Sequence, residues 1–305
     1  MSVEDESLAQ AIAGLNLQEQ QSADGRSRFL GNKSLDFPTG RLYGGQMLGQ
    51  AIMAGGRTVP EGRLPHSMHA YYLRTGLLDQ DVHADVETIR DGRSFSSRRV
   101  DLHQGERTIL NALLSYQQVG QEGVRYADPM PTGLPDPEDL PGSRELMEPY
   151  ADKSPFADYY AHQSPFDMRH VGGTVLLDDA DDAEHGDSKD DSRSRQAVWS
   201  RTQGRAELDP LMRRALLAME CDQIMMEPAL RRAGLSMTTP GISFASIDHA
   251  MWWYQDLDPC DWHCFIQESP VADHGRSLCM AKVYNRQGDL AAYMVQEAMI
   301  RVPKD

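Results

Sequence analysis

The C-terminal part of the chain alternates apolar and polar residues in two successive segments, which is the pattern of a β-hairpin. Residues 274–301 predict two long strands joined by a turn at 285–288. Side chains alternate between the two faces of a strand, so one face of the second strand carries this row: Leu290, Ala292, Met294, Gln296, Ala298 and Ile300. Gln296 is the polar exception. It is either a core amide with hydrogen-bond partners or a functional group.

An earlier segment, residues 91–117, aligns with this hairpin without a gap. Both segments share a Gly-Arg-Ser sequence, and Gly92 lies 183 positions before Gly275. A duplication of this length predicts two similar half-domains packed together. In the same alignment Leu113 takes the place of Gln296, so only the second half carries the polar group.

Helical spacing of apolar residues predicts a short docking helix within residues 5–20 and a second helix in LYGGQMLGQAIMAGG. The second helix is predicted to open at Gly44 and Gly45 and to end at Gly55 and Gly56. Its free N–H groups could bind an oxyanion or a phosphate, or the glycines could permit close packing against a sheet. Strands are predicted at about 67–73, 81–90, 94–103 and 108–117, which is the content of an α+β half-domain.

The composition changes after residue 118. Eight of the seventeen prolines lie between Pro129 and Pro165, which predicts a linker over residues 119–165. The chain is therefore divided into a first unit at 1–118, this linker, and a second unit at 166–305. Within the second unit, residues 178–195 form an acidic run with almost no apolar residue, which predicts an exposed and poorly ordered insertion.

A helix is predicted to start at Asp209-Pro210, an N-cap acid followed by proline. One stripe of this helix carries Met212, Ala215, Met219, Asp222 and Met226. A carboxylate on an apolar face must be hydrogen-bonded, protonated or directed into a cavity. Asp222 is thus either a functional residue or a cap at the helix end.

Residues 241–254 predict an aromatic-rich strand that carries Ser246, Asp248 and His249. These three residue types suggest a catalytic triad. Strict alternation would place Ser246 and His249 on opposite faces, and the nucleophile elbow of hydrolases is absent. Structural roles are predicted for Asp248 and His249.

Composition excludes some classes of function. The 305-residue chain has a net charge of −16, which argues against binding nucleic acid or an anionic membrane surface. The sequence has no membrane span and no N-terminal signal peptide, so a cytoplasmic location is expected. Cys260 and Cys264 have a spacing that could begin a metal site, but no second pair or close-spaced His partner follows in register. The four cysteines are therefore expected to be reduced structural thiols, and no metal is predicted.

The motifs RLYGGQMLGQAI, LPHSMHAYYLRTG, FASIDHAMWW and MVQEAMIR, in this order, resemble the acyl-CoA thioesterase II family of double hotdog hydrolases. The resemblance covers nearly the whole chain apart from the linker and the acidic insertion. It implies an α+β fold with two hotdog units, each an antiparallel sheet that wraps a long helix, with the two sheets joined.

The catalytic set implied by this resemblance is Asp222, Ser246 and Gln296, with Ser246 where the family often has Thr. Together they would activate a water molecule that hydrolyses an acyl-CoA thioester without a covalent intermediate. Gly44 or Gly45 would supply N–H groups to the oxyanion. No cofactor is implied, and acyl-CoA is the expected partner.

Two alternatives remain at this point. A hotdog enoyl-CoA hydratase or dehydratase would need a paired Asp and His on the second helix, which LLAMECDQIMMEP lacks. A non-catalytic acyl-CoA binding protein would bind the thioester without turnover. Hotdog proteins often associate through their sheets, so a homo-oligomer is also predicted.

Overall fold

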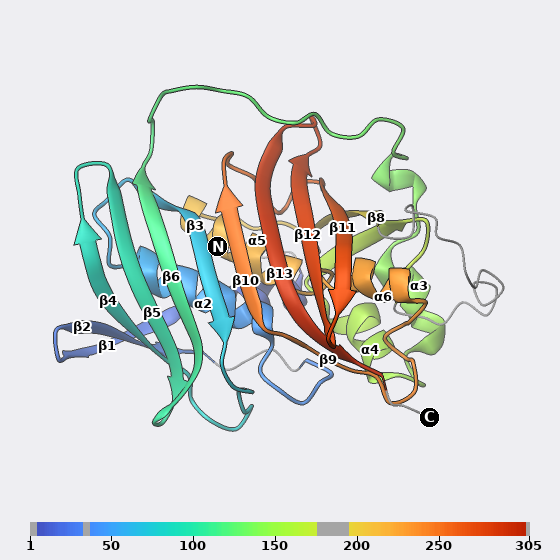
Figure 1. Cartoon of the computed structure of the whole chain (residues 1–305), viewed down its shortest axis with the longest axis horizontal. Coiled ribbons are helices and arrows are strands. Elements are labelled where there is room, and N and C mark those ends of the chain that lie inside the picture. The colour runs from blue at the N-terminus through green and yellow to red at the C-terminus, as the bar shows by residue number, and fades with distance from the viewer. Residues whose placement is uncertain (1–4, 33–36, 176–194, 303–305) are drawn as a thin grey trace.

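A computed structural model describes residues 5–32, 37–175 and 195–302. In this part of the chain thirteen strands form one antiparallel sheet, in the order β1-β2-β4-β5-β6-β3-β10-β13-β12-β11-β8-β7, with β9 beside β13 (Figure 1). The predicted α+β class with a large antiparallel sheet is confirmed. The acidic insertion lies outside the described residues except for Arg195, so the prediction about its order is not tested.

The first half contributes β1 (Leu17–Ala23), β2 (Arg26–Gly31), β3 (Arg63–Tyr72), β4 (His83–Asp91), β5 (Phe95–Gln104) and β6 (Arg107–Gln118). The second half contributes β7 (Phe166–Val171), β8 (Arg195–Thr202), β9 (Ser243–Ser246), β10 (Asp248–Trp253), β11 (His263–Asp273), β12 (Arg276–Asn285) and β13 (Leu290–Arg301). The halves join where β3 pairs with β10, so their strands form one continuous surface.

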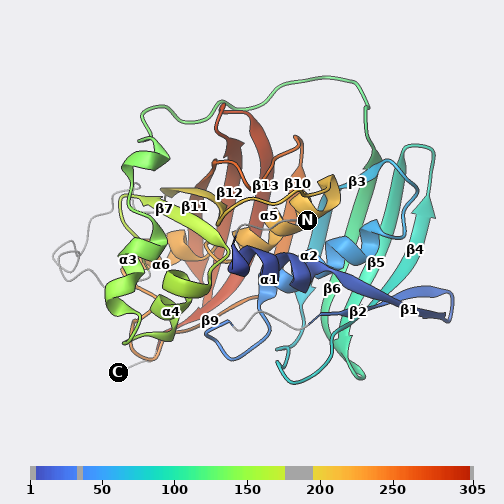
Figure 2. The same ribbon diagram turned by 180° about the vertical axis from the view of Figure 1, so that it is seen from behind.

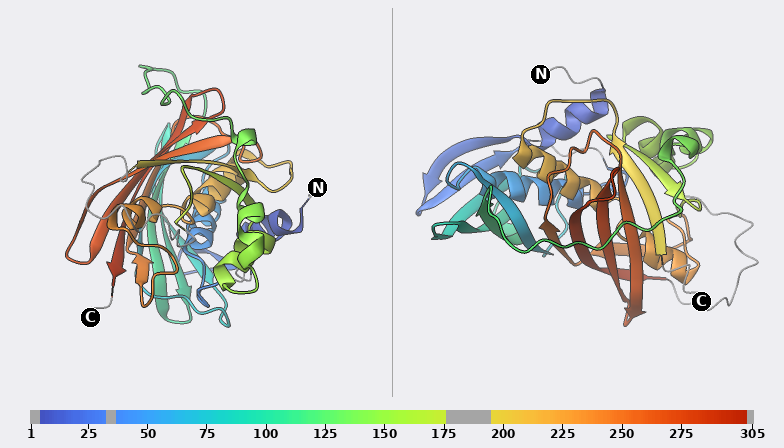
Figure 3. Two further views of the ribbon diagram at one scale, coloured as in Figure 1. Left: turned by 90° about the vertical axis from the view of Figure 1, so that its right-hand side faces the viewer. Right: turned by 90° about the horizontal axis from the view of Figure 1, so that it is seen from above.

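The helices are α1 (Glu6–Leu15), α2 (Gly44–Gly56), α3 (Ser143–Met147), α4 (Pro155–Asp158), α5 (Pro210–Cys221) and α6 (Glu227–Ala233), with short helical turns η1 (Pro137–Asp139), η2 (Glu148–Tyr150) and η3 (Tyr159–Gln163). The sheet curves around α2 and α5 (Figures 2 and 3). Helix α2 packs against β3 to β6 and against α5, while α6 packs against β11 and β12. Both halves share one hydrophobic core. None of the described helices is long and apolar enough to cross a membrane.

The predicted repeat is present in the strand boundaries but not in the orientation of every side chain. Strands β6 and β13 begin and end 183 positions apart. Leu113 nevertheless faces outward with 51% of its surface exposed, whereas Gln296 is 1% exposed. Leu113 and Gln296 therefore do not occupy equivalent positions in the two halves, and the prediction from the ungapped sequence alignment is wrong on this point.

The hairpin loops explain this difference. The loop before β13 is longer than the loop before β6, and the pairing register changes with it. The register differs by three residues, since an offset of 183 would place Tyr116 on Met299, and an odd shift turns every side chain to the opposite face. Ser96 and Cys279 are buried equivalents on β5 and β12, and they pair with Tyr116 and Gln296 respectively. Tyr116 is thus the true counterpart of Gln296, and the first half still lacks the amide.

The helix predicted to begin at Pro210 does so, since the Asp209 carboxylate accepts a hydrogen bond from the N–H of Met212 at 2.9 Å. It ends earlier than the apolar stripe suggested. Helix α5 stops at Cys221, and hydrogen bonds between residues three apart form a tighter turn before α6. Pro228 lies in the first turn of α6, where its missing N–H is not needed. This break leaves Asp222 at the C-terminal end of α5.

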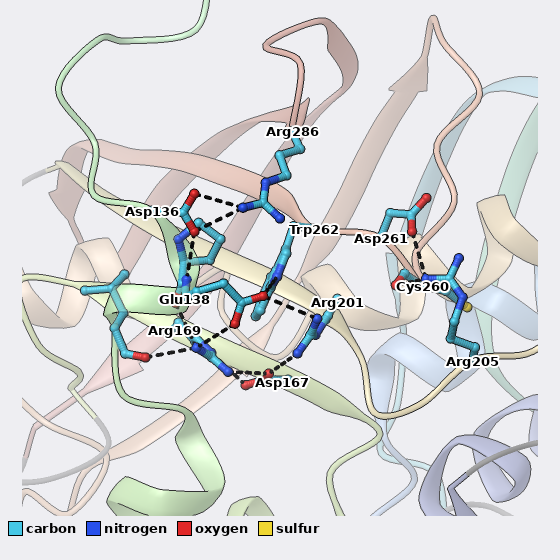
Figure 4. A network of polar contacts seen from close by, with 12 residues as sticks. Asp136, Glu138, Asp167, Arg169, Arg201, Arg205, Cys260, Asp261, Trp262 and Arg286 are labelled. Carbon is cyan, nitrogen blue, oxygen red and sulfur yellow. Dashed lines mark hydrogen bonds and ion pairs between the residues drawn. The ribbon is translucent and has the colours of Figure 1, made fainter.

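The proline-rich segment leaves β6, crosses over the sheet and reaches α3 on the opposite side (Figure 1). Its central part is fixed to the second half by a polar network (Figure 4). Asp136 pairs with Arg286 at 2.8 Å, and Glu138 accepts a hydrogen bond from the indole of Trp262 at 2.8 Å. Arg201 stacks on the same indole at 4.2 Å. The later part, including Tyr160, enters the main core, so this segment also builds the fold.

Candidate active site

A partly open cavity of about 310 Å³ lies where the two halves meet. Its walls come from three parts of the chain: Tyr43, Gly44 and Tyr72 from the first half, Phe156 and Tyr160 from the proline-rich segment, and Asp222, Met226 and Ser246 from the second half. The lining is largely apolar and aromatic, with a carboxylate and hydroxyl groups at one end. Such a cavity suits a ligand with an apolar chain and a polar reacting group.

Asp222 follows the last residue of α5 and is anchored on both sides by buried contacts. Glu220, two residues before it, bonds to His263 at 2.9 Å. The carbonyl of Ile224, two residues after it, accepts a hydrogen bond from Gln267 at 2.9 Å. Burial opposes protonation of His263, but the neighbouring Glu220 raises its pKa. These contacts hold the turn that carries the Asp222 carboxylate.

Ser246 and Gln296 meet this carboxylate. The hydroxyl of Ser246 donates to Oδ1 of Asp222 at 3.3 Å and accepts from Nε2 of Gln296 at 2.7 Å. Gln296 also interacts with the Asp222 carboxylate. Asp222 and Ser246 line the cavity, whereas Gln296 is buried behind them. The three residues named by the sequence therefore lie together, although each comes from a different element.

A break at Ile247 makes this arrangement differ from the expected alternation. Ser246 pairs with Ala298, but Ala250 pairs with Val295, so the register slips by one residue between β9 and β10. The slip turns Ser246 and His249 to the same face of the sheet. The expectation that they face apart is wrong, because it assumed one uninterrupted strand.

His249 does not contact Ser246 directly, because Gln296 lies between them. Nδ1 of His249 is 2.8 Å from Oε1 of Gln296, and its Nε2 is 3.5 Å from Sγ of Cys221. Burial lowers the pKa of His249 to about 4, so the ring is neutral near pH 7. Because Oε1 of Gln296 can only accept, Nδ1 must carry the hydrogen. A Ser–His nucleophile pair is thus absent, whereas His249 fixes the orientation of the amide.

Burial raises the pKa of Asp222 from its ordinary value of 3.8 to about 6. Hydrogen bonds from Ser246, the N–H of Gly45 and Gln296 favour the charged form and limit this rise. The carboxylate is therefore ionised near pH 7 but basic enough to accept a proton. This is the property that a general base requires.

The two glycines at the start of α2 have different surroundings. A Cβ on Gly45 would lie 2.2 Å from the carbonyl oxygen of Met219, so this glycine permits the close approach of α2 and α5. A Cβ on Gly44 would lie 2.6 Å from Oδ2 of Asp222. Close packing accounts for Gly45, and its N–H contacts Asp222. Gly44 leaves open the space in front of the carboxylate.

Sequence reasoning did not find Tyr43 and Tyr72. The hydroxyl of Tyr43 donates to the carbonyl of Met219 at 2.5 Å and ties the start of α2 to the end of α5. Tyr72 stands at the end of β3 and lines the cavity. Both lie within motifs that carry the family resemblance, RLYGGQMLGQAI and LPHSMHAYYLRTG. Nothing in those motifs assigned them a role, because their proximity to Asp222 depends on how the two halves pack.

All four cysteines are buried free thiols, as predicted: Cys221, Cys260, Cys264 and Cys279. Across residues 5–32, 37–175 and 195–302, no three His, Cys, Asp or Glu side chains gather closely enough to hold a metal ion.

Comparisons with known proteins agree over most of the chain. Family models of the acyl-CoA thioesterase N-terminal and C-terminal domains match residues 34–117 and 135–300. Acyl-CoA thioesterase 2 of Haemophilus influenzae is 30% identical over 277 residues, covering 88% of this chain and 91% of that protein.

Solved structures give the fold. The acyl-CoA thioesterase II TesB2 of Mycobacterium marinum has a TM-score of 0.72 at 29% identity, covering 97% of this chain and 98% of that one. A hotdog-fold protein of unknown function from Alicyclobacillus acidocaldarius has a TM-score of 0.72 at 16% identity, covering 97% and 99%. The fold and the cavity thus define a hotdog protein with an acid at the end of an apolar cavity. The chain belongs to the acyl-CoA thioesterase family.

Proposed function

We propose that this acyl-CoA thioesterase hydrolyses its substrate with a water molecule activated by Asp222, Ser246 and Gln296. The observation that carries the proposal is their convergence at the polar end of the cavity: Ser246 bonds to both other residues, and Asp222 has a pKa of about 6. These are the elements of general-base catalysis without a covalent intermediate.

In this mechanism Asp222 accepts a proton from the water as its oxygen attacks the thioester carbonyl carbon. Ser246 positions the water, and Gln296 holds Ser246 and Asp222 from behind. Collapse of the tetrahedral intermediate breaks the carbon–sulfur bond. The departing CoA sulfur takes up the proton that Asp222 accepted, which returns Asp222 to its ionised form, and the acyl group leaves as a carboxylic acid. Gly44 is the preferred backbone donor to the oxyanion, since Gly45 already contacts Asp222.

The substrate would lie with its acyl chain among the apolar walls and its CoA moiety toward solvent. Two exposed arginines, Arg41 and Arg74, line the same cavity. Arg74 also donates to the carbonyl of Thr108 at 2.8 Å, which fixes its guanidinium. We assign these two cations to the CoA phosphates, because guanidinium groups bind phosphate well. Local positive charge would then serve an anionic substrate despite the net charge of −16.

We also propose that the chain consists of two hotdog units, residues 1–118 and 166–305, connected by residues 119–165. The 183-residue spacing of β6 and β13 and the packing of α2 against β3 to β6 support this division. Self-association through the outer face of the sheet stays a prediction. That face exposes Phe95 and Leu113, and light scattering coupled to size exclusion tests it.

Release of free thiol from a panel of acyl-CoAs tests the proposed function. Wild-type protein should release CoA, and Asp222→Asn should release almost none while binding the substrate. Water addition to an enoyl-CoA without thiol release would instead identify a hydratase. Binding of acyl-CoA without any chemistry would identify a binding protein, and either outcome would overturn the proposal.

A further inference from the structure

The hydroxyl of Tyr72 takes no part in the hydrogen bonds that join Asp222, Ser246 and Gln296. It is buried in the cavity wall and has no hydrogen-bond partner among the residues that the structure describes. Buried hydroxyl groups are rarely left unpaired, because the lost hydrogen bond to water is costly. An unpaired group that lines a cavity therefore indicates a partner that arrives with a ligand.

Tyr72 lies directly across from the acid. A Cβ atom placed on Gly44 would lie 2.6 Å from Oδ2 of Asp222 and 3.1 Å from the Tyr72 hydroxyl oxygen. Because residue 44 is glycine, no side chain separates the phenol from the carboxylate. The Tyr72 hydroxyl and the Asp222 carboxylate therefore border the same position in front of Gly44.

The backbone holds Tyr72 in this place. Its N–H donates to the carbonyl of Ile247 at 2.9 Å, the residue that follows Ser246. The first half of the chain is thus connected to the strand break that orients Ser246. Neighbouring Tyr71 points to the other face of the sheet and is 56% exposed.

The phenol of Tyr72 is protonated and can donate a hydrogen bond. Burial, with the nearby charge of Asp222, raises the pKa of its phenol well above the usual value. The hydroxyl therefore keeps its hydrogen near neutral pH, where Asp222 is ionised. A thioester carbonyl oxygen is purely an acceptor, and it gains negative charge when water attacks the carbon.

We propose that Tyr72 is a further catalytic residue, whose hydroxyl donates a hydrogen bond to the thioester carbonyl oxygen and to the oxyanion that forms from it. This inference rests on the proposed function of Asp222 and Ser246. It assigns the first half of the chain a direct part in the reaction, because Tyr72 and Gly44 line the same cavity as Asp222 and Ser246 of the second half.

The test compares Tyr72→Phe with Tyr71→Phe, which removes the same group one residue away on the outer face. Tyr72→Phe should lower kcat/KM by about 10- to 100-fold, mainly through kcat, while Tyr71→Phe stays within twofold of wild type. Thermal stability of Tyr72→Phe should be unchanged or higher, because the variant removes an unpaired buried hydroxyl. A purely structural hydroxyl would instead lower stability and leave kcat intact.

Binding of two unreactive analogues isolates the contact with the carbonyl. One analogue replaces sulfur by CH₂ and keeps the carbonyl as a ketone, and the other is an S-alkyl thioether without a carbonyl. Wild type should prefer the ketone by about 3- to 10-fold, on the scale of one hydrogen bond, and Tyr72→Phe should lose this preference. An equal preference in both proteins would overturn the proposal.

Asp222→Asn, assayed with the same substrates, distinguishes a failure of the role proposed for Tyr72 from a failure of the proposed function. If Asp222→Asn is inactive and Tyr72→Phe is fully active, the role of Tyr72 is wrong and the proposed function stands. If Asp222→Asn remains active, the proposed function itself fails.

Discussion

The ring of His249 donates from Nδ1 to the side-chain oxygen of Gln296 at 2.8 Å, and this bond determines which way the amide faces. With Oε1 held by His249, Nε2 of Gln296 must point toward Ser246, which it reaches at 2.7 Å. A reversed amide would present an oxygen to Ser246 and to the Asp222 carboxylate. His249 is therefore a positioning residue that acts through Gln296.

His249→Leu should lower kcat by about tenfold, because the amide loses its fixed orientation. His249→Asn, which can place an N–H near the original Nδ1, should recover part of the activity. In a double-mutant cycle, adding His249→Leu to Gln296→Leu should cause little further loss, since both changes remove the same contact. Independent, multiplying losses at constant melting temperature would contradict this role.

Asp222→Asn should reduce kcat by about 10²- to 10⁴-fold, the range for loss of a positioned general base. It should also stabilise the fold near pH 8. The folded pKa of about 6 exceeds the ordinary value of 3.8, so ionised Asp222 costs on the order of 1–3 kcal/mol above pH 6. As the pH falls toward 3.8, Asp222 becomes protonated in both the folded and the unfolded protein, so the difference in stability should be much smaller at pH 4. Melting curves of both proteins at pH 4 and pH 8 measure it.

The pH dependence of kcat/KM should follow Asp222. The carboxylate is the active form, so activity should be constant above its pKa of about 6 and fall nearly tenfold per pH unit below it. The hydrogen bond from Ser246 lowers this pKa. The residual activity of Ser246→Ala should therefore have a midpoint at higher pH than wild type. A midpoint that stays in place or falls would contradict the Ser246–Asp222 contact.

Ser246 should behave as a water-positioning group and not as a nucleophile. Ser246→Thr keeps the hydroxyl and should retain substantial activity, whereas Ser246→Ala should lose about 10- to 1000-fold. Rapid mixing should show no burst of thiol release. An acyl group found on Ser246 by mass spectrometry during turnover would establish a covalent mechanism instead.

Arg41→Ala should raise KM for acyl-CoA by about 3- to 30-fold with little change in kcat, because it removes a phosphate contact remote from the reacting carbon. The effect should be weaker at high salt and absent for an acyl-pantetheine thioester, which lacks the nucleotide phosphates. Arg125→Ala is the matched control, since Arg125 is exposed and lies outside the cavity. Equal effects on both substrates would exclude phosphate recognition.

Local patterns in the sequence determined much of the fold. Alternation predicted β13, the glycines predicted both ends of α2, and Asp209-Pro210 predicted the start of α5. These features depend on residues close in the chain, through side-chain periodicity, capping and backbone freedom. The polar exceptions on apolar faces, Asp222 and Gln296, were also visible, and the family resemblance added Ser246.

Tertiary structure decided which faces and partners these elements present. The slip at Ile247 turned Ser246 and His249 to the same side, and a longer hairpin loop made Tyr116 the counterpart of Gln296. Strand register depends on pairing between distant segments, so a period of two along one strand cannot determine it. For the same reason no local pattern assigned a role to Tyr72, because this residue reaches Asp222 only where β3 meets β10.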